Sequence, residues 1–212
     1  MQKQTEWIRP EEIERRSMEI IEKEMPEGKW TLGERLVVKR CIHASADFDY
    51  ASHLYFSPGA VQRALEILKS GASLVTDTNM AAAGINKRAL GRLGGTLHCF
   101  MADEDVAREA RERGITRAAV SMERAAKLTE PVIFVIGNAP TALIWLYDMI
   151  QAGQASPAFI IAVPVGFVNV VESKERIKQT DVPCIVAEGR KGGSNIAAAI
   201  CNALMYQIIE NW

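Results

Sequence analysis

Short apolar runs rich in β-branched residues alternate with helix-like segments from about residue 73 onward, and this alternation constrains the fold more than any other feature. The runs show no clear polar–apolar alternation, which is typical of strands covered on both faces. The expected strands are Ser73–Asp77, Leu97–Met101, Val132–Ile136, Phe159–Val163 and Cys184–Glu188. Strand–helix alternation favours parallel strands joined by right-handed crossovers.

The segments around these strands have helical patterns with recognisable ends. Gly114 follows a highly charged segment, Ser194 suits an N-cap, and Pro140 suits a first helical turn. The expected helices are Pro10–Lys23, Gly33–Ala46, Pro58–Lys69, Asp103–Arg113, Thr116–Leu128, Pro140–Gln151, Val170–Lys178 and Ser194–Ile209. We therefore expect an α/β fold: a three-layer sandwich with a mainly parallel sheet of about five strands, flavodoxin-like or Rossmann-like. The first three helices would form an N-terminal helical extension.

The length of 212 residues suits one globular domain with a substantial core. The chain contains no internal repeat, no low-complexity tract and no linker rich in Gly, Ser or Pro. We expect a single domain over residues 1–212, with residues 1–70 packed on or over the α/β core.

Charge and cysteine usage bear on partners and compartment. A formal net charge of −1 gives no reason to expect nucleic acid or an anionic membrane as a partner. The charged stretch Met1–Ile21 has no apolar core of a signal peptide, and runs such as Ala158–Val165 are too short to span a bilayer. The four cysteines form no C-x-x-C pair. These features predict a reduced, cytoplasmic protein.

Polar and glycine-rich loops follow the predicted strands, where open α/β sheets bind their ligands. They contain Asp77 and Thr78 after the first strand, Asn138 after the third and Gly166 after the fourth. The loop Gly189–Ser194 after the fifth strand is the most informative. Its three glycines and following helix start, with Arg190 and Lys191, suit a carboxylate or phosphate, although a flexible basic turn is the alternative interpretation. No phosphate-loop or dinucleotide-binding spacing appears.

His43 is the candidate acid–base residue among the three histidines. It falls near the C-terminus of the Gly33–Ala46 helix, on the same stripe as Arg40, whereas His98 lies inside an apolar strand and His53 could lie on the surface. A histidine can give and retrieve a proton near neutral pH, but a structural role for His43 is equally compatible with its position. The histidines are too scattered for a metal site, and none is expected.

Four groups of residues together resemble the precorrin-8X and cobalt-precorrin-8 methylmutase family. They are Arg40–His43 with Asp47–Tyr50, then Thr76–Ile85, then Gly137–Leu143, and last Val163–Lys174 with Gly189–Ser194. The resemblance runs from about Ile13 to Ile208. It implies a flavodoxin-like homodimer that moves a methyl group between adjacent carbons of a corrin precursor without a redox cofactor.

The resemblance also implies roles for individual residues. His43 matches the acid–base residue, and Ser17, Arg40 and Arg117 match residues that contact the substrate. Ala44 and Ser45 after His43, and Met18 after Ser17, depart from the family pattern; these differences could tune the pocket.

A flat macrocycle edged by carboxylates calls for an apolar slot with cations around its rim. The candidate cations are Arg40, Arg117, Arg190 and Lys191, and the glycines that would let the backbone approach the ring are Gly137, Gly166 and Gly192.

Two other functions fit the same features: a tetrapyrrole carrier without catalysis, and a flavin or nicotinamide oxidoreductase suggested by fold class alone. The missing glycine-rich turn after the first strand counts against the oxidoreductase. The sequence leaves open whether the substrate contains cobalt and whether two subunits share one pocket.

Overall fold

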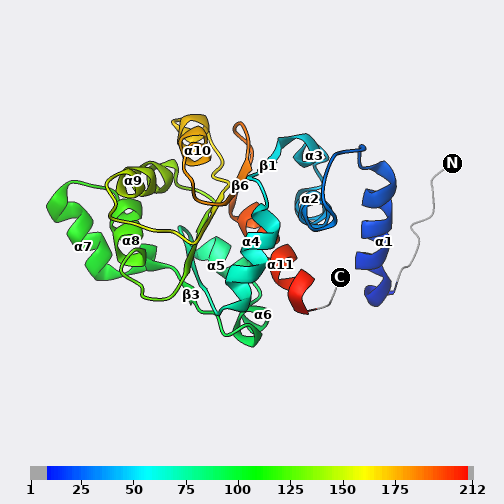
Figure 1. Cartoon of the computed structure of the whole chain (residues 1–212), viewed down its shortest axis with the longest axis horizontal. Helices are drawn as coiled ribbons and strands as arrows, with labels where there is room; N and C mark the ends of the chain where they lie inside the picture. Colours follow the sequence, from blue (N-terminus) through cyan, green and yellow to red (C-terminus); the bar gives the residue numbers. More distant parts are fainter. Residues whose placement is uncertain (1–8, 210–212) are drawn as a thin grey trace.

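The computed structural model describes residues 9–209, which form an α/β fold around one sheet of six strands (Figure 1). The spatial order is β1-β6-β5-β4-β2-β3. The strands are β1 (Leu54–Phe56), β2 (Ser73–Thr76), β3 (Leu97–His98), β4 (Val132–Ile136), β5 (Phe159–Ala162) and β6 (Cys184–Ala187). All neighbouring pairs are parallel except β1 and β6. The predicted α/β class and mainly parallel sheet are therefore confirmed, and the sheet has six strands where about five were expected.

The additional strand, β1, is an antiparallel edge that the sequence pattern did not predict. It has only three residues and follows directly after the four-residue helix α3 (Tyr50–His53). Such a short run gives no measurable periodicity, and its register (Leu54 opposite Ala187) depends on residues far along the chain.

The predicted strand Leu97–Met101 was too long. Strand β3 ends at His98, because it lies at the other sheet edge and pairs only with Leu74 and Val75 of β2. The chain then enters a short 3-10 helix, Phe100–Ala102. The other four predicted strands exist, three of them ending one residue earlier than expected.

Alternate side chains of the central strands enter two separate hydrophobic cores. In β4, Ile133 and Val135 belong to one core, whereas Val132, Phe134 and Ile136 belong to the other. All five residues are buried, because helices cover both faces of the sheet. This double burial explains why the strand sequences are apolar without alternation.

The helices divide between the two faces of the sheet (Figure 1). One face is covered by α4 (Ala60–Lys69), α5 (Asn79–Gly84), α6 (Lys87–Arg92) and α11 (Ser194–Ile209). The other is covered by α8 (Arg117–Ala125), α9 (Pro140–Gln151) and α10 (Val170–Lys178), with α7 (Glu104–Arg113) packed against α8. The predicted bounds of α9, α10 and α11 are confirmed.

Three short helices were not predicted, namely α3, α5 and α6. The six-residue helices α5 and α6 are too short for a periodic pattern and are defined by their caps. Thr78 accepts a hydrogen bond from the Ala81 N–H, and Asn86 accepts one from the Ala89 N–H. The predicted helices Pro58–Lys69 and Thr116–Leu128 were longer than α4 and α8.

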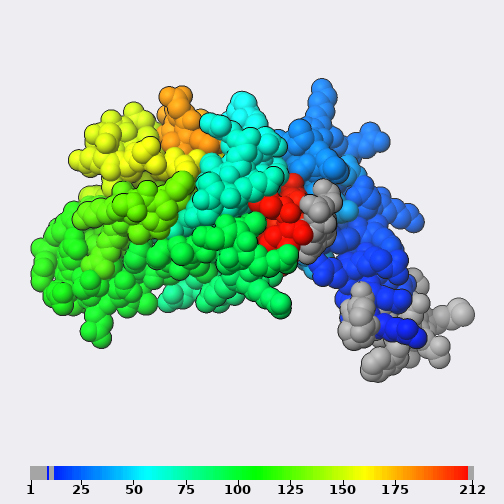
Figure 2. Space-filling view, turned by 60° about the horizontal axis from the view of Figure 1, so that its bottom comes forward, coloured from blue at the N-terminus to red at the C-terminus, as the bar shows by residue number. Residues whose placement is uncertain are grey.

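Two N-terminal helices, α1 (Pro10–Glu24) and α2 (Leu32–Ser45), lie beyond the sheet-covering layer (Figures 1 and 2). A capping box of Thr31 and Glu34 begins α2, which packs against α11, and α1 in turn packs against α2. Helix α11 therefore lies between the sheet and α2, which explains its apolar sequence. Part of the Met1–Ile21 stretch, and the chain ends of the predicted 1–212 domain, fall outside the described residues. Within residues 9–209, no helix combines the length and apolarity needed to cross a membrane.

Candidate functional site

Asp77 organises the turn that follows β4. Its carboxylate, only 1% exposed, accepts hydrogen bonds from the backbone N–H groups of Gly137 (2.8 Å), Asn138 (2.8 Å) and Ala139 (2.6 Å). Burial raises the pKa of Asp77, and the three donors oppose that shift. The carboxylate oxygens of Asp77 thus accept hydrogen bonds from the protein itself. Asp77 can influence a bound ligand by holding the turn that carries Asn138.

Thr78 connects this turn region to the start of α11. Its Oγ1 lies 2.8 Å from Oγ of Ser194 and also caps α5. Gly137 completes the junction, because a Cβ there would come within 2.9 Å of the Ser194 Cα. The carboxyl ends of β2 and β4 and the first turn of α11 are therefore packed as one unit.

An open cleft of about 520 Å³ lies beside this unit. Its lining residues are Asp77, Thr78, Asn79, Met101, Ala102, Thr116, Arg117, Ala118, Asn138, Ala139 and Thr141. Arg117 and Asn138 are exposed. Four of the sequence-predicted site residues, Asp77, Thr78, Asn138 and Arg117, thus line one cleft at the carboxyl edge of the sheet.

The loops after β5 and β6 are joined by backbone hydrogen bonds. Gly193 donates to the Val163 carbonyl at 2.8 Å, and Gly166 donates to the Arg190 carbonyl at 3.2 Å. Gly192 has φ +152°, and a Cβ there would overlap the Val163 carbonyl oxygen. Glycine at position 192 is therefore required by this close approach.

Lys174 of α10 is a fully buried cation that the sequence analysis did not identify. Its ammonium group donates to the carbonyls of Gly189 (2.9 Å) and Lys191 (2.8 Å), so it holds the Gly189–Ser194 loop from beneath. Burial lowers the pKa of Lys174 to about 8. The available signal was its position on the buried stripe that includes Val170 and Ile177.

Lys191 was predicted as a cation at the rim of the substrate site, but its charge is paired within the protein. Its ammonium group lies 2.6 Å from carboxylate oxygens of both Asp47 and Asp49. These carboxylates follow the end of α2, so the ion pairs join the Gly189–Ser194 loop to that end. The pKa of Asp47 is held below its usual range, mainly by the hydrogen bond from Lys191.

Arg190 has different surroundings from its neighbour. Its guanidinium carbon lies 5.4 Å from the centre of the Phe167 ring, and no carboxylate of residues 9–209 forms an ion pair with it. Of the two cations predicted for this loop, Arg190 is the one whose charge is left for a ligand.

His43 is exposed in the last turn of α2. The helix ends at Ser45, and its C-cap Ala46, with a φ of +54°, turns the chain towards Asp47. The clasp made by Lys191 with Asp47 and Asp49 therefore fixes the segment that directly follows His43.

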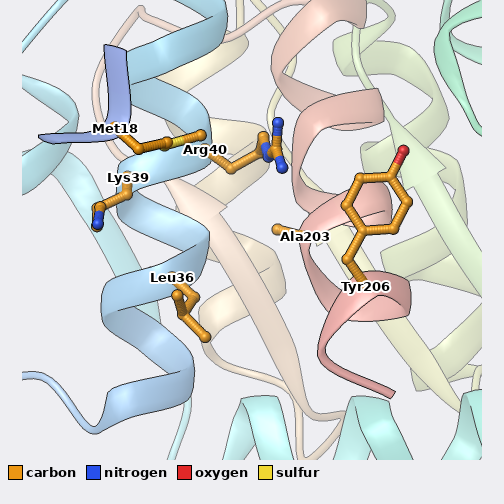
Figure 3. Close-up of a pocket in the computed structure, with 6 residues that line it drawn as sticks. All are labelled: Met18, Leu36, Lys39, Arg40, Ala203 and Tyr206. Carbon is orange, nitrogen blue, oxygen red and sulfur yellow. The ribbon is translucent and has the colours of Figure 1, made fainter. Parts of the chain in front are cut away.

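Arg40 and Ser17 lie apart from the Arg117 cleft. Arg40 packs among α1, α2 and α11, where its guanidinium is 2.6 Å from Glu14 and 5.4 Å from the centre of the Tyr206 ring (Figure 3). The small cavity there is lined by Met18, Leu36, Lys39, Arg40, Ala203 and Tyr206. The hydroxyl of Ser17 donates to the Ile13 carbonyl at 2.8 Å. The structure thus separates the predicted site residues: no residue lines both cavities, and the loops after β5 and β6, which hold Gly166, Arg190, Lys191 and Gly192, line neither of them.

Among residues 9–209, no three His, Cys, Asp or Glu side chains are grouped in a way that could hold a metal ion.

Known proteins resemble this chain over most of its length. A model of the precorrin-8X methylmutase family matches residues 12–207. The cobalt-precorrin-8 methylmutase of Priestia megaterium is 40% identical over 197 residues, which cover 93% of this chain and 88% of the relative. The precorrin-8X methylmutase of Pseudomonas aeruginosa is 42% identical over 173 residues, covering 81% and 82%. The solved precorrin-8X methylmutase of Thermus thermophilus has a TM-score of 0.87 and 36% identity, covering 94% of this chain and 98% of that one.

Proposed function

The chain belongs to the precorrin-8X methylmutase family, an enzyme family of methyl migration, and on this premise we propose the reaction and substrate of this member. The enzyme is an isomerase of corrin biosynthesis that moves a methyl group between adjacent ring carbons. Its substrate is precorrin-8X or cobalt-precorrin-8, and its product is hydrogenobyrinate or cobyrinate. The observation that carries the proposal is the family match over residues 12–207, which include every proposed site residue.

The cleft at the carboxyl edge of the sheet suits one part of such a substrate. Its lining combines the apolar side chains of Met101 and Ala139 with the exposed cation Arg117 and the amide of Asn138. Arginine binds a carboxylate through two parallel hydrogen bonds, and the apolar lining suits a macrocycle face. Arg117 and Asn138 are therefore the proposed substrate contacts here, with Asp77 and Thr78 holding their loops in place.

His43 is the proposed proton donor and acceptor. Its exposed ring makes no hydrogen bond within the described residues, so both nitrogens are accessible to a ligand. The imidazolium would protonate the conjugated ring system and promote migration of the methyl group with its bonding electrons to the adjacent carbon. The neutral imidazole would then take a proton back from the product, so the step leaves the composition of the macrocycle unchanged. The proposed reaction neither oxidises nor reduces the macrocycle, so it uses no redox cofactor.

A homodimer is proposed as the functional form. The separation of Arg40 and Ser17 from the Arg117 cleft supports an arrangement in which a second copy brings the two groups to one substrate. Exposed apolar side chains on α1 and α2, the helices that carry Ser17 and Arg40, also support it; they are Ile13, Ile20 and Leu32.

Residues 1–212 are proposed to form one domain of the flavodoxin-like, doubly wound type. The order of the five parallel strands, β3-β2-β4-β5-β6, supports this arrangement, as does the core that contains Ile21 of α1, Val38 of α2 and Ile161 of β5. The four cysteines are all unpaired, which supports a reducing, cytoplasmic setting.

The test is to incubate the purified protein with the late corrin precursor, with and without cobalt, and to follow the visible spectrum and product mass. Conversion to a new chromophore of unchanged mass supports the isomerase. The substrate that is converted faster shows whether the enzyme acts on the cobalt-containing or the metal-free precursor. A precursor that binds but stays unaltered under both conditions contradicts the proposal and favours a carrier.

A further inference from the structure

The loop between β5 and α10 exposes adjacent apolar side chains. Val165 is 47% exposed, Phe167 82% and Val168 77%. Exposed apolar side chains that lie next to one another can mark a surface for a ligand or partner. This surface patch lies at the carboxyl edge of the sheet, the edge that also carries the Arg117 cleft.

The loop is held firmly in spite of its exposure. Gly166 donates to the Arg190 carbonyl at 3.2 Å, and a Cβ at Gly166 would touch the Val170 side chain. The facing loop is fixed in turn by Lys174, which donates to the carbonyls of Gly189 and Lys191. The backbone that carries the patch is therefore held in place, which lowers the entropy cost of binding a rigid ligand.

A cation that pairs with no carboxylate of residues 9–209 lies over this patch. The Arg190 guanidinium carbon is 5.4 Å from the centre of the Phe167 ring, in the geometry of a cation–π contact. Lys191, one residue further, is matched by Asp47 and Asp49, whereas no carboxylate of the described residues pairs with Arg190. In this loop, the charge of Lys191 therefore stabilises the protein, whereas the charge of Arg190 is available to a ligand.

We propose that Phe167 and Arg190 form a binding platform for the macrocycle, with the ring face packed on Phe167 and Val168 and a peripheral carboxylate paired with Arg190. This inference rests on the proposed function and extends its substrate site to a surface outside the Arg117 cleft. Charge complementarity identifies the occupant. A flat ring with peripheral carboxylates can pack its face on Phe167 and pair a carboxylate with the guanidinium of Arg190.

The experiment measures the dissociation constant of hydrogenobyrinate from the full chain by visible absorbance, together with KM and kcat. Arg190→Met is expected to weaken binding about tenfold to a hundredfold through loss of a charged hydrogen bond. Phe167→Ala is expected to weaken it about tenfold, and Phe167→Trp is expected to keep near-normal affinity. In all three variants kcat at saturation should stay within about threefold of the parent, since neither residue moves a proton.

Arg176→Met is the matched control. Arg176 also lies over an aromatic ring, Tyr147, at 5.6 Å, but it faces Asp148 at 3.7 Å on a helical surface. It should leave the dissociation constant unchanged. A methyl-esterified macrocycle should bind the parent and Arg190→Met equally, because the paired carboxylate is absent.

Unchanged affinity in both Arg190→Met and Phe167→Ala, in an enzyme that still converts its substrate, would overturn the platform and leave the proposed function standing. Dissociation of a dimer by Phe167→Ala without a change in affinity would also overturn it, by assigning the patch to a second copy. Failure of the parent protein to convert the precursor would contradict the proposed function instead.

Discussion

The ammonium group of Lys191 lies 2.6 Å from a carboxylate oxygen of Asp47, and Asp49 approaches the same group equally closely. This clasp joins the loop after β6 to the segment after α2. His43 lies just before that segment, so the clasp sets the position of the proposed proton donor relative to the strand-end loops. It makes Lys191 a positioning residue.

Replacement of Lys191 by Met should lower kcat about tenfold or more while KM changes little, because a displaced general acid acts on the transition state. Asp47→Asn should show the same loss, and the double variant should lose little more, since both changes break one clasp. Lys178→Met, which removes the ion pair between the end of α10 and Glu188 just after β6, is the control. Strictly additive losses in the double variant would argue against a shared clasp.

Replacement of His43 by Asn should reduce turnover about a hundredfold to ten-thousandfold and leave product binding intact, because acid–base help supplies that factor. Single-turnover kinetics and the visible spectrum of the bound product measure the two effects. His98→Asn, at the sheet edge, should retain activity. Near-normal turnover in His43→Asn would remove His43 from the mechanism.

Lys174 should make the stability of the protein depend on alkaline pH. Burial lowers its pKa from 10.5 to about 8 in the folded state, so between these values the unfolded chain binds more protons than the native one. The free energy of unfolding should therefore rise through this window, by up to about 3 kcal/mol from this group. Lys174→Met should lack this rise. Urea unfolding at several pH values measures it, and parallel pH curves for parent and variant would contradict the assignment.

Asp77→Asn should destabilise the turn after β4. The backbone N–H groups that now donate to the Asp77 carboxylate would face the NH2 group of the asparagine, which is itself a donor. We expect a loss of about 1–3 kcal/mol in the free energy of unfolding and a raised KM through the displaced Asn138. Thermal unfolding and steady-state kinetics measure the two effects. Asp181→Asn, at an exposed loop position, is the control and should change neither.

The sequence was most informative where a strand is buried on both faces. The bounds of β4 were predicted correctly because its five residues are apolar throughout. Strand β1 was missed because three residues give no periodicity, and its pairing with β6 is a long-range contact. Helices α5 and α6 were missed because each is little more than one capped turn.

Within the site, the sequence predicted the residue types but not their use. Arg190 and Lys191 are adjacent cations in one loop, and only the fold brings Asp47 to Lys191 from 144 residues away. Asp77 was predicted as a contact with the substrate, and its engagement with the turn at Gly137–Ala139 depends equally on the fold. Lys174, by contrast, could have been found from its place on the buried stripe of α10.

The position of α11 between the sheet and α2 also affects the order in which the chain can fold. Val37, Val38, Cys41 and Ile42 are buried in the core that contains α11, and β1 pairs with no strand other than β6 among the described residues. During synthesis, α2 and β1 are made before β6 and α11. The apolar stripe of α2 therefore stays uncovered until α11 has been made and has left the ribosome.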